Sequence, residues 1–331
     1  MTIARNSCFD AFEGMMPLEE ALGRLKAAVG PIDRVETLPL SEAGGRVLAE
    51  DVISPMDVPP HNNAAVDGYA VFHEDLMPGG ETRLPVTGRV AAGHALSRMP
   101  RKGEALRIFT GAPVPEGPDT IIMQEDAQEE NGDVLLNPGV KRGANLRSAG
   151  EDIQVGATIL RTGHLIRPQD VGYVASVGRA DVRVYSRPRV AVFSTGDEVL
   201  EPGQRLTPGG IYDANRFAIA AVLRGMGCVV TDLGILPDSL EIIAKALGNA
   251  ALEHDLIITS GGVSMGDEDH VKAAVESQGA LHFWRVAIKP GRPIALGQVA
   301  DTPFIGLPGN PVAALVTFLR MGRMLVARLA G

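Results

Sequence analysis

The feature that most constrains this chain is a regular alternation of short apolar runs and amphipathic segments over its second half. Residues 189–194, 228–236 and 255–260 are rich in β-branched and apolar side chains, and a helix-like segment follows each of them. Strands that are apolar throughout are buried on both faces, and helices between successive strands make those strands parallel. Residues 187–331 are therefore predicted to form a mostly parallel α/β sheet covered by helices on both faces.

The first half has a different pattern. Residues 18–29 have the apolar spacing of an amphipathic helix that ends at Gly30 and Pro31. Between residues 69 and 145, short apolar runs separated by glycine and proline are typical of a small all-β unit. We expect this β unit to be inserted into a split α+β domain. Residues 1–16 are expected to form a leader, and residues 17–60 with 147–186 the split first domain. Residues 61–146 would form the inserted β domain and residues 187–331 the α/β domain.

Charge and cysteine content exclude several classes of protein. The net charge of −9 argues against nucleic-acid or anionic-membrane partners, because both bind basic surfaces. No apolar stretch approaches the roughly 18 residues of a membrane span, and the N-terminus lacks the apolar run of a signal peptide. Cys8 and Cys228 lie in no CxxC motif, so no disulfide framework is expected. A cytoplasmic location follows as the expectation.

Two glycine-containing segments follow predicted strands. In an open α/β sheet, ligands bind beyond the carboxyl ends of the strands. The segment 194–198 (STGDE) offers hydroxyls, a glycine and Glu198, which suit a phosphate and a base or metal ligand; a capped turn is the structural alternative. The segment 208–215 (PGGIYDAN) suits a phosphate or a pterin-like ring, and the alternative is that Asp213 simply caps a helix.

A third segment, residues 259–270, carries three glycines and the acids Asp267, Glu268 and Asp269. Acidic residues at a helix start also stabilise the helix dipole, which is the structural alternative. Asp238, however, follows the neighbouring strand. Two carboxylates converging on one edge are the usual ligands of a divalent cation that bridges phosphates.

The same segment matches the nucleophile elbow GxSxG, with Ser264 at its centre. A serine hydrolase is therefore an alternative. An elbow places the serine on a sharp strand-to-helix turn, whereas about nine residues separate the predicted strand and helix here. Between Ser264 and the histidines that follow it, His270 and His282, the only acids are the local cluster and Glu276. This is the wrong layout for the order serine, acid, histidine, so the context disfavours a hydrolase.

A fourth segment concentrates positive charge in an acidic protein. Arg285, Lys289 and Arg292 lie within eight residues braced by prolines, which indicates an anion site; a solvated basic strand edge is the alternative. Residues 307–311 (LPGNP) then form a rigid turn that places Pro311 at the first helical position.

Taken in order, eight segments of the chain resemble the MoeA family, molybdopterin molybdotransferase, which is related to the E domain of gephyrin. The resemblance runs from about Pro17 to the end of the chain, and the common order makes it more specific than any single motif. The segments are NNAAVDGYAV, RIFTGAPVP, AGEDI, FSTGDE, IYDAN, SGGVSMGDED, AIKPGRP and GLPGNP.

The resemblance implies insertion of molybdate into adenylylated molybdopterin with release of AMP, assisted by a divalent cation such as Mg²⁺. It also implies an elongated homodimer whose site combines the α/β domain of one subunit with the DGYA and GEDI regions of the other. The molybdopterin adenylyltransferase and acceptor molybdoenzymes are its expected partners.

The resemblance also implies the site residues. Asp238 and Asp269 would hold the metal, Lys289 and Arg292 would attract molybdate or phosphate, and Asp67 with Asp152 would complete the site across the dimer. Catalytic roles fall on Asp67, Asp152, Glu198, Asp238, Asp269 and Lys289. Binding roles fall on Thr110, Arg147, Thr195, Gly196, Ser260, Gly261, Gly262, Ser264, Arg285, Arg292, Pro308 and Pro311.

The chain departs from the family pattern at three places. Arg285 stands where lysine is frequent, and Ala64 replaces a common serine before DGYA. The family also continues into a further small β domain, whereas this sequence stops at Gly331. Two alternatives follow: a module that binds molybdopterin without catalysis, and an adenylyl-transferring relative that shares the α/β domain. The DGYA, GEDI and PGNP segments weigh against the adenylyl-transferring relative.

Overall fold

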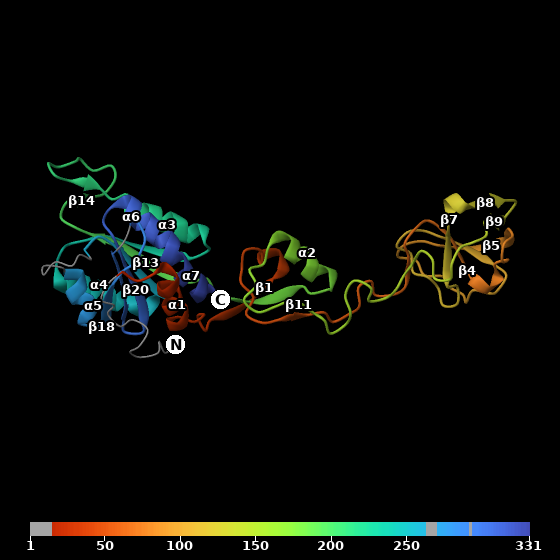
Figure 1. Cartoon of the computed structure of the whole chain (residues 1–331), viewed down its shortest axis with the longest axis horizontal. Helices are drawn as coiled ribbons and strands as arrows, with labels where there is room; N and C mark the ends of the chain where they lie inside the picture. The colour runs from red at the N-terminus through yellow and green to blue at the C-terminus, as the bar shows by residue number, and fades with distance from the viewer. Residues whose placement is uncertain (1–14, 263–269, 291–292) are drawn as a thin grey trace. The chain divides into compact units, whose positions relative to one another are not determined.

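The computed structural model describes residues 15–262, 270–290 and 293–331, with the backbone alone at 282–285 and 293 (Figure 1). Its contacts divide the chain into two compact units. The α/β unit contains the chain up to Glu50, Arg161–Pro168 and Asp181–Gly331, and the β unit contains Asp51–Leu160 and Gln169–Ala180. Each unit is described by itself.

A six-stranded sheet forms the centre of the α/β unit. Its strand order is β16-β13-β17-β20-β19-β18, in which the first four strands are parallel and the last two run antiparallel to their neighbours. The prediction of a mostly parallel sheet is therefore confirmed. The strands are β13 (Arg189–Thr195), β16 (Val229–Leu236), β17 (Leu256–Ser260), β18 (Gly279–Arg285), β19 (Pro293–Val299) and β20 (Thr302–Leu307).

Helices cover both faces of this sheet, because successive strand residues point to opposite sides. Val190 and Val192 of β13 belong to one buried cluster, whereas Ala191 and Phe193 belong to another. The first cluster includes residues of α1, α3 and α7, and the second includes residues of α4 and α5. The helices are α1 (Leu18–Ala28), α3 (Asn215–Gly225), α4 (Leu240–Glu253), α5 (His270–Glu276), α6 (Pro311–Thr317) and α7 (Arg323–Ala330), with a π-helical turn (Phe318–Gly322) between the last two.

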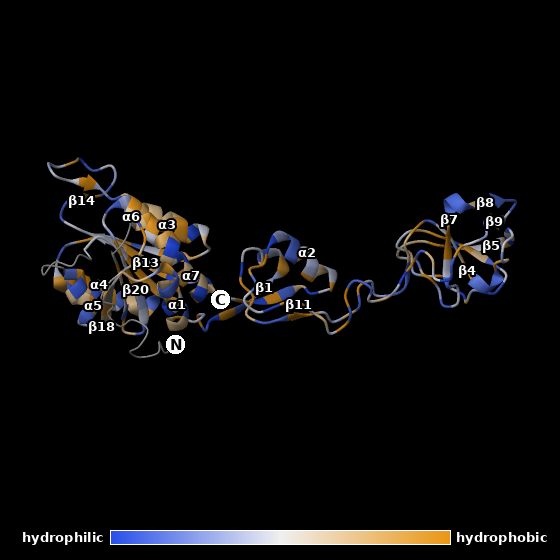
Figure 2. Cartoon of the chain, in the orientation of Figure 1, coloured by the Kyte–Doolittle hydropathy of each residue, from blue (hydrophilic) through white to orange (hydrophobic). Residues whose placement is uncertain are grey.

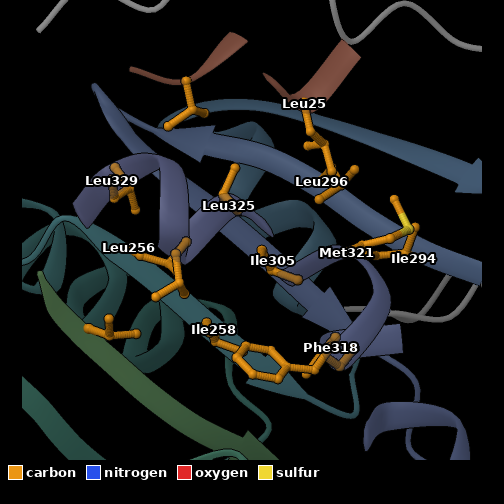
Figure 3. Close-up of a cluster of buried hydrophobic side chains, with 14 of the residues drawn as sticks. Leu25, Leu256, Ile258, Ile294, Leu296, Ile305, Phe318, Met321, Leu325 and Leu329 are labelled. Atoms are coloured by element: carbon orange, nitrogen blue, oxygen red, sulfur yellow. The ribbon is translucent and has the colours of Figure 1, made fainter. Parts of the chain in front are cut away.

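Helix α1 packs in the core of the α/β unit. The sequence analysis had assigned it to the split first domain instead. Its buried residues include Ala21 and Leu25, and Leu25 lies in the same cluster as Leu296 and Leu325 (Figure 3). The backbone N–H of Ile32 also donates to the carbonyl of Leu329 at 3.0 Å. An amphipathic pattern shows that one face of a helix is buried, but it does not identify the surface that buries it.

The expected first domain is shared between the two units. Its outer strands β1 (Val35–Pro39) and β12 (Asp181–Tyr185) pair antiparallel and group with the α/β unit. Strands β2 (Val52–Ile53) and β11 (Thr158–Leu160) pair and group with the β unit, as does most of α2 (Pro168–Ser176). The chain thus leaves and returns through paired strands, as an insertion requires.

The β unit contains a second six-stranded sheet with the order β7-β4-β6-β5-β9-β8. The long strand β5 pairs with β9 along its first half and with β6 along its second half, with a bulge between Val86 and Gly88. This change of partner curls the sheet. The strands are β4 (Gly68–Val71), β5 (Thr82–Val90), β6 (Ala105–Ile108), β7 (Thr120–Met123), β8 (Ala127–Glu130) and β9 (Asp133–Leu136).

Short elements complete the described chain. Three 3-10 turns lie at Leu40–Glu42, His73–Asp75 and Gln124–Asp126. Four short strands form the pairs β3 (Asn63–Ala64) with β10 (Leu146–Arg147), and β14 (Val199–Leu200) with β15 (Ile211–Tyr212).

Replacing Phe318 by alanine tests the larger core cluster. Phe318 is fully buried in the π-helical turn, so its loss should lower the free energy of unfolding by about 3–5 kcal/mol. Urea unfolding followed by the fluorescence of Trp284, the single tryptophan and a residue of β18, reports on this unit. Leu252→Ala is the control, because Leu252 is 85% exposed. Equal midpoints for the two variants would contradict the packing described.

Candidate functional site

Four parallel strands, β13, β17, β20 and β16, have their carboxyl ends at the same level of the sheet. Ser194 pairs with Ser260, Ser260 pairs with Leu307, and Thr195 pairs with Leu236. The connections that follow β13, β17, β20 and β16 therefore share one edge, which we call the carboxyl edge. Antiparallel pairing of Arg285 with Pro293 and of Ala295 with Gly306 brings the β18–β19 connection to the same edge.

This edge collects most of the residues predicted for the α/β unit. Glu198 lies just past β13 and Asp238 lies two residues past the end of β16, and both are exposed. Lys289, also exposed, lies in the β18–β19 connection, and Pro308 and Pro311 flank the turn after β20. The structure thus brings two carboxylates and a cation from distant parts of the chain to one edge.

The turn after β17 approaches the end of β13 closely. A Cβ on Gly262 would lie 2.4 Å from Cγ2 of Thr195, so this position admits only glycine in the observed backbone. Thr195 itself is 2% exposed and lies beneath the turn. The sequence predicted that Thr195 binds the ligand; its side chain is buried against Gly262, and the binding role stays a prediction.

Two buried hydroxyls at this edge lack partners. Neither Ser194 Oγ nor Thr195 Oγ1 makes a hydrogen bond with any residue that the structure describes. Leaving a buried hydroxyl unpaired costs roughly 1–3 kcal/mol. Gly196, directly after them, has a φ of 134°. Such local costs are typical of functional sites.

Asn215, the first residue of α3, connects the end of β17 to the turn after β20. Its Nδ2 donates to Oγ of Ser260 at 2.7 Å and to the carbonyl of Gly309 at 2.8 Å. The sequence analysis singled out the IYDAN segment but not this side chain. An amide at the start of a helix after a glycine pair is the signal that was available.

Arg216 is the centre of a buried ion-pair cluster beside Asn215. Its Nε donates to Oδ2 of Asp213 at 2.8 Å, one terminal nitrogen donates to Oε1 of Glu201 at 2.5 Å, and the other donates to Asp232. Burial opposes ionisation of Asp232, but hydrogen bonds from Arg216 and the Gly234 N–H outweigh it and lower the pKa of Asp232. The cluster fixes the start of α3 against β16.

The predicted residues of the β unit form two polar pairs. The N–H and the hydroxyl of Thr110 donate to Oδ1 of Asp67 at 2.8 and 2.7 Å, and these bonds lower the pKa of Asp67. Arg147 donates to both oxygens of Asp152 at 2.7 and 2.6 Å. The pairs lie on either side of one segment, because Ala64 is hydrogen-bonded to residues 111–112 and Asn63 pairs with Arg147.

Several predicted residues cannot be placed. Ser264, Asp269 and Arg292 lie outside the described residues, as does the side chain of Arg285. The metal pair Asp238 and Asp269 therefore stays a prediction. Among the residues described, no group of three or more histidine, cysteine, aspartate or glutamate side chains is arranged to hold a metal ion.

Comparison with known proteins places the chain in a family. The MoeA N-terminal region (domains I and II) matches residues 16–178, and a probable molybdopterin binding domain matches residues 191–328. The molybdopterin molybdenumtransferase of Haemophilus influenzae is 42% identical over 96% of this chain and 78% of its own length. The molybdopterin molybdenumtransferase 2 of Mycobacterium tuberculosis is 40% identical over 85% of this chain and 72% of its own length. The chain belongs to the MoeA family.

A solved MoeA-family structure supports the fold. The molybdopterin biosynthesis MoeA protein of Pyrococcus horikoshii superposes with a TM-score of 0.82 at 33% identity, over 95% of this chain and 80% of that one. Membership makes this MoeA-family chain an enzyme, a transferase of molybdenum cofactor biosynthesis. In the part of the chain that the structure describes, no helix is long and apolar enough to span a membrane.

Replacing Arg216 by methionine tests the ion-pair cluster. The change leaves the buried carboxylate of Asp213 without its cation, so we expect a loss of about 3–5 kcal/mol at pH 7. Arg216 also lowers the pKa of Asp232, so the stabilisation from that pair is complete above the ordinary value of 3.8 and is lost as the pH falls below it. The difference between wild type and variant should therefore shrink in acid.

Urea unfolding at pH 7 and at about pH 3, below the ordinary pKa of an aspartate, measures this difference. Arg224→Met is the matched control on the same helix, because Arg224 is exposed. A loss for Arg216→Met that equals the control, or that stays constant with pH, would contradict the proposed role of the charges.

Proposed function

We propose that this protein inserts molybdate into adenylylated molybdopterin and releases AMP, in the cytoplasm and with Mg²⁺ or another divalent cation. The observation that carries the proposal is the convergence of Glu198, Asp238 and Lys289 on the carboxyl edge of a sheet that matches a probable molybdopterin binding domain. The phosphoanhydride between AMP and molybdopterin is the bond that breaks.

Opposite charges at one edge suit this chemistry. The carboxylate of Asp238 is exposed, and carboxylate oxygens are the ligands that Mg²⁺ prefers. In the proposal, Asp238 and Asp269 would hold the cation, and its positive charge would offset the negative charge that develops on the phosphate as AMP leaves. Lys289, with Arg285 and Arg292, attracts molybdate, itself a dianion.

We further propose that a second copy of the chain completes the enzyme. Helices α3 and α6 are neighbours, and Figure 2 shows apolar residues along both of them. Phe217 and Val312 are 48% and 62% exposed, and Leu319 in the adjoining π-helical turn is 41% exposed. Large apolar side chains gathered on one face are typical of protein interfaces. In the proposed dimer, Asp67 and Asp152 of one copy serve the site of the other.

The free, buried state of Cys228 is compatible with a reducing compartment such as the proposed cytoplasm. Cys228 is a buried free thiol, and burial raises its pKa to about 11. Such a thiol is a weak nucleophile and a poor partner for oxidation. The fold therefore depends on no disulfide at this position.

Replacing Asp238 by asparagine tests the proposed cation site. The change keeps the size of the side chain but removes its charge, so molybdate-dependent AMP release should fall by about 100-fold or more, near 3 kcal/mol of activation free energy. Quantifying AMP by chromatography after adding molybdate and Mg²⁺ to the protein with adenylylated molybdopterin measures it.

Asp301→Asn is the matched control, because Asp301 is an exposed aspartate in the turn between β19 and β20, at the other end of the strands. Unchanged AMP release by Asp238→Asn would contradict the role of Asp238 as a ligand of the cation. Tight binding of molybdopterin without AMP release by the wild type would identify a binding module instead.

Replacing Phe217 by aspartate tests the proposed dimer face. A carboxylate at the centre of an apolar interface is desolvated without a partner, so the variant should elute as a monomer where the wild type elutes as a dimer. Size-exclusion chromatography with light scattering gives the mass directly. Leu252→Asp, on α4, should stay dimeric. A dimeric Phe217→Asp variant would exclude this face.

A further inference from the structure

We propose that Asn215 is a positioning residue, whose side-chain amide sets the placement of the end of β17 relative to the turn after β20 and thereby the affinity for adenylylated molybdopterin. The inference rests on the proposed function. It adds a residue from a third element, helix α3, whose role is to hold the two turns and not to contact the reacting atoms.

The NH₂ group of the side chain is used fully. The two N–H bonds of Nδ2 reach partners on different elements, namely Ser260 Oγ at the end of β17 at 2.7 Å and the Gly309 carbonyl in the turn after β20 at 2.8 Å. The same serine hydroxyl lies 3.4 Å from the carbonyl of Pro308. An NH₂ group has only two protons to donate, so no other side-chain donor of Asn215 remains for a further partner.

The sheet itself holds these turns weakly. The ladder between β17 and β20 ends at the pair Ser260 and Leu307. One step further, the N–H of Gly261 is 3.3 Å from the carbonyl of Leu307, a long bond. The positive φ values of Gly261 and Gly262, 88° and 64°, then take the chain out of the extended conformation. The bonds from Asn215 lie where backbone pairing stops.

The bond to Gly309 also orients a peptide group. In a trans peptide the C=O and the following N–H point in opposite directions, so a carbonyl held toward Asn215 fixes the N–H of Asn310 away from it. The side chain of Asn310 is itself occupied, because it accepts the N–H of Ala313 at 3.0 Å. The Pro308 to Pro311 turn therefore has one orientation while Asn215 is present.

Helix α3 is a rigid support for this amide. Arg216, the next residue, is 3% exposed and binds Asp213, Glu201 and Asp232. The start of α3 is thus anchored by the cluster, and Asn215 transfers that fixed position to the two turns. A mobile side chain on a surface helix would not serve this purpose, because each bond would first have to overcome the entropy of ordering it.

The test combines two measurements on Asn215→Ala, Asn215→Asp and the control Asn249→Ala, an exposed asparagine on α4. Hydrogen exchange without ligand should speed up in peptides that cover 260–262 and 308–313 in both Asn215 variants, because a carboxylate cannot donate to the Gly309 carbonyl. In kinetics, the KM for adenylylated molybdopterin should rise about tenfold or more with a smaller change in kcat.

The outcomes distinguish failure of the positioning role of Asn215 from failure of the proposed function. Exchange at the two turns equal to that of the Asn249→Ala control would overturn the proposal, whatever the activity. Faster exchange with an unchanged KM would overturn the positioning role and leave a structural one. An inactive wild type would refute the proposed function, and in that case loss of molybdopterin affinity in the Asn215 variants, measured by calorimetry, decides the positioning role.

Discussion

The in-register parallel pairing of β13, β17, β20 and β16 is the constraint on which the rest of the structure depends. Because Ser194, Ser260 and Leu307 lie opposite one another, the connections after these strands begin at the same level. Residues far apart in the sequence then share one edge with no need for direct contact. A shift of register in any one strand would move its turn away from the others and flip its side chains to the other face.

Much of this arrangement could be predicted from the sequence, because burial on both faces leaves a clear signal. The strand 256–260 begins with three apolar residues and is buried along its whole length, and the helices between the strands carry a single apolar stripe, so the sheet and its carboxyl edge follow. The strand that precedes Asp238, β16, was expected to neighbour β17, the strand before the third segment, but β13 lies between them in the sheet.

What the sequence did not predict depends on contacts without periodicity. The bond from Asn215 to the Gly309 carbonyl spans 94 positions and ends on a backbone atom, which no residue pattern marks. The destination of α1 was missed because its stripe fits any apolar surface. The close approach of Gly262 to Thr195, which buries the threonine, also has no sequence signal, because only coordinates reveal such an approach.

The carboxyl edge combines elements held by hydrogen bonds and ion pairs with buried groups that lack hydrogen-bond partners. Arg216 and Asn215 fix the helix and the turns, while two hydroxyls beneath them stay unpaired among the described residues.

The most direct test of the account is hydrogen exchange of the wild type with and without adenylylated molybdopterin. In the α/β unit, protection should concentrate in peptides covering 194–198, 237–239, 260–262 and 307–310. Protection at the opposite edge instead, over 187–190, 227–230 and 300–302, would contradict it.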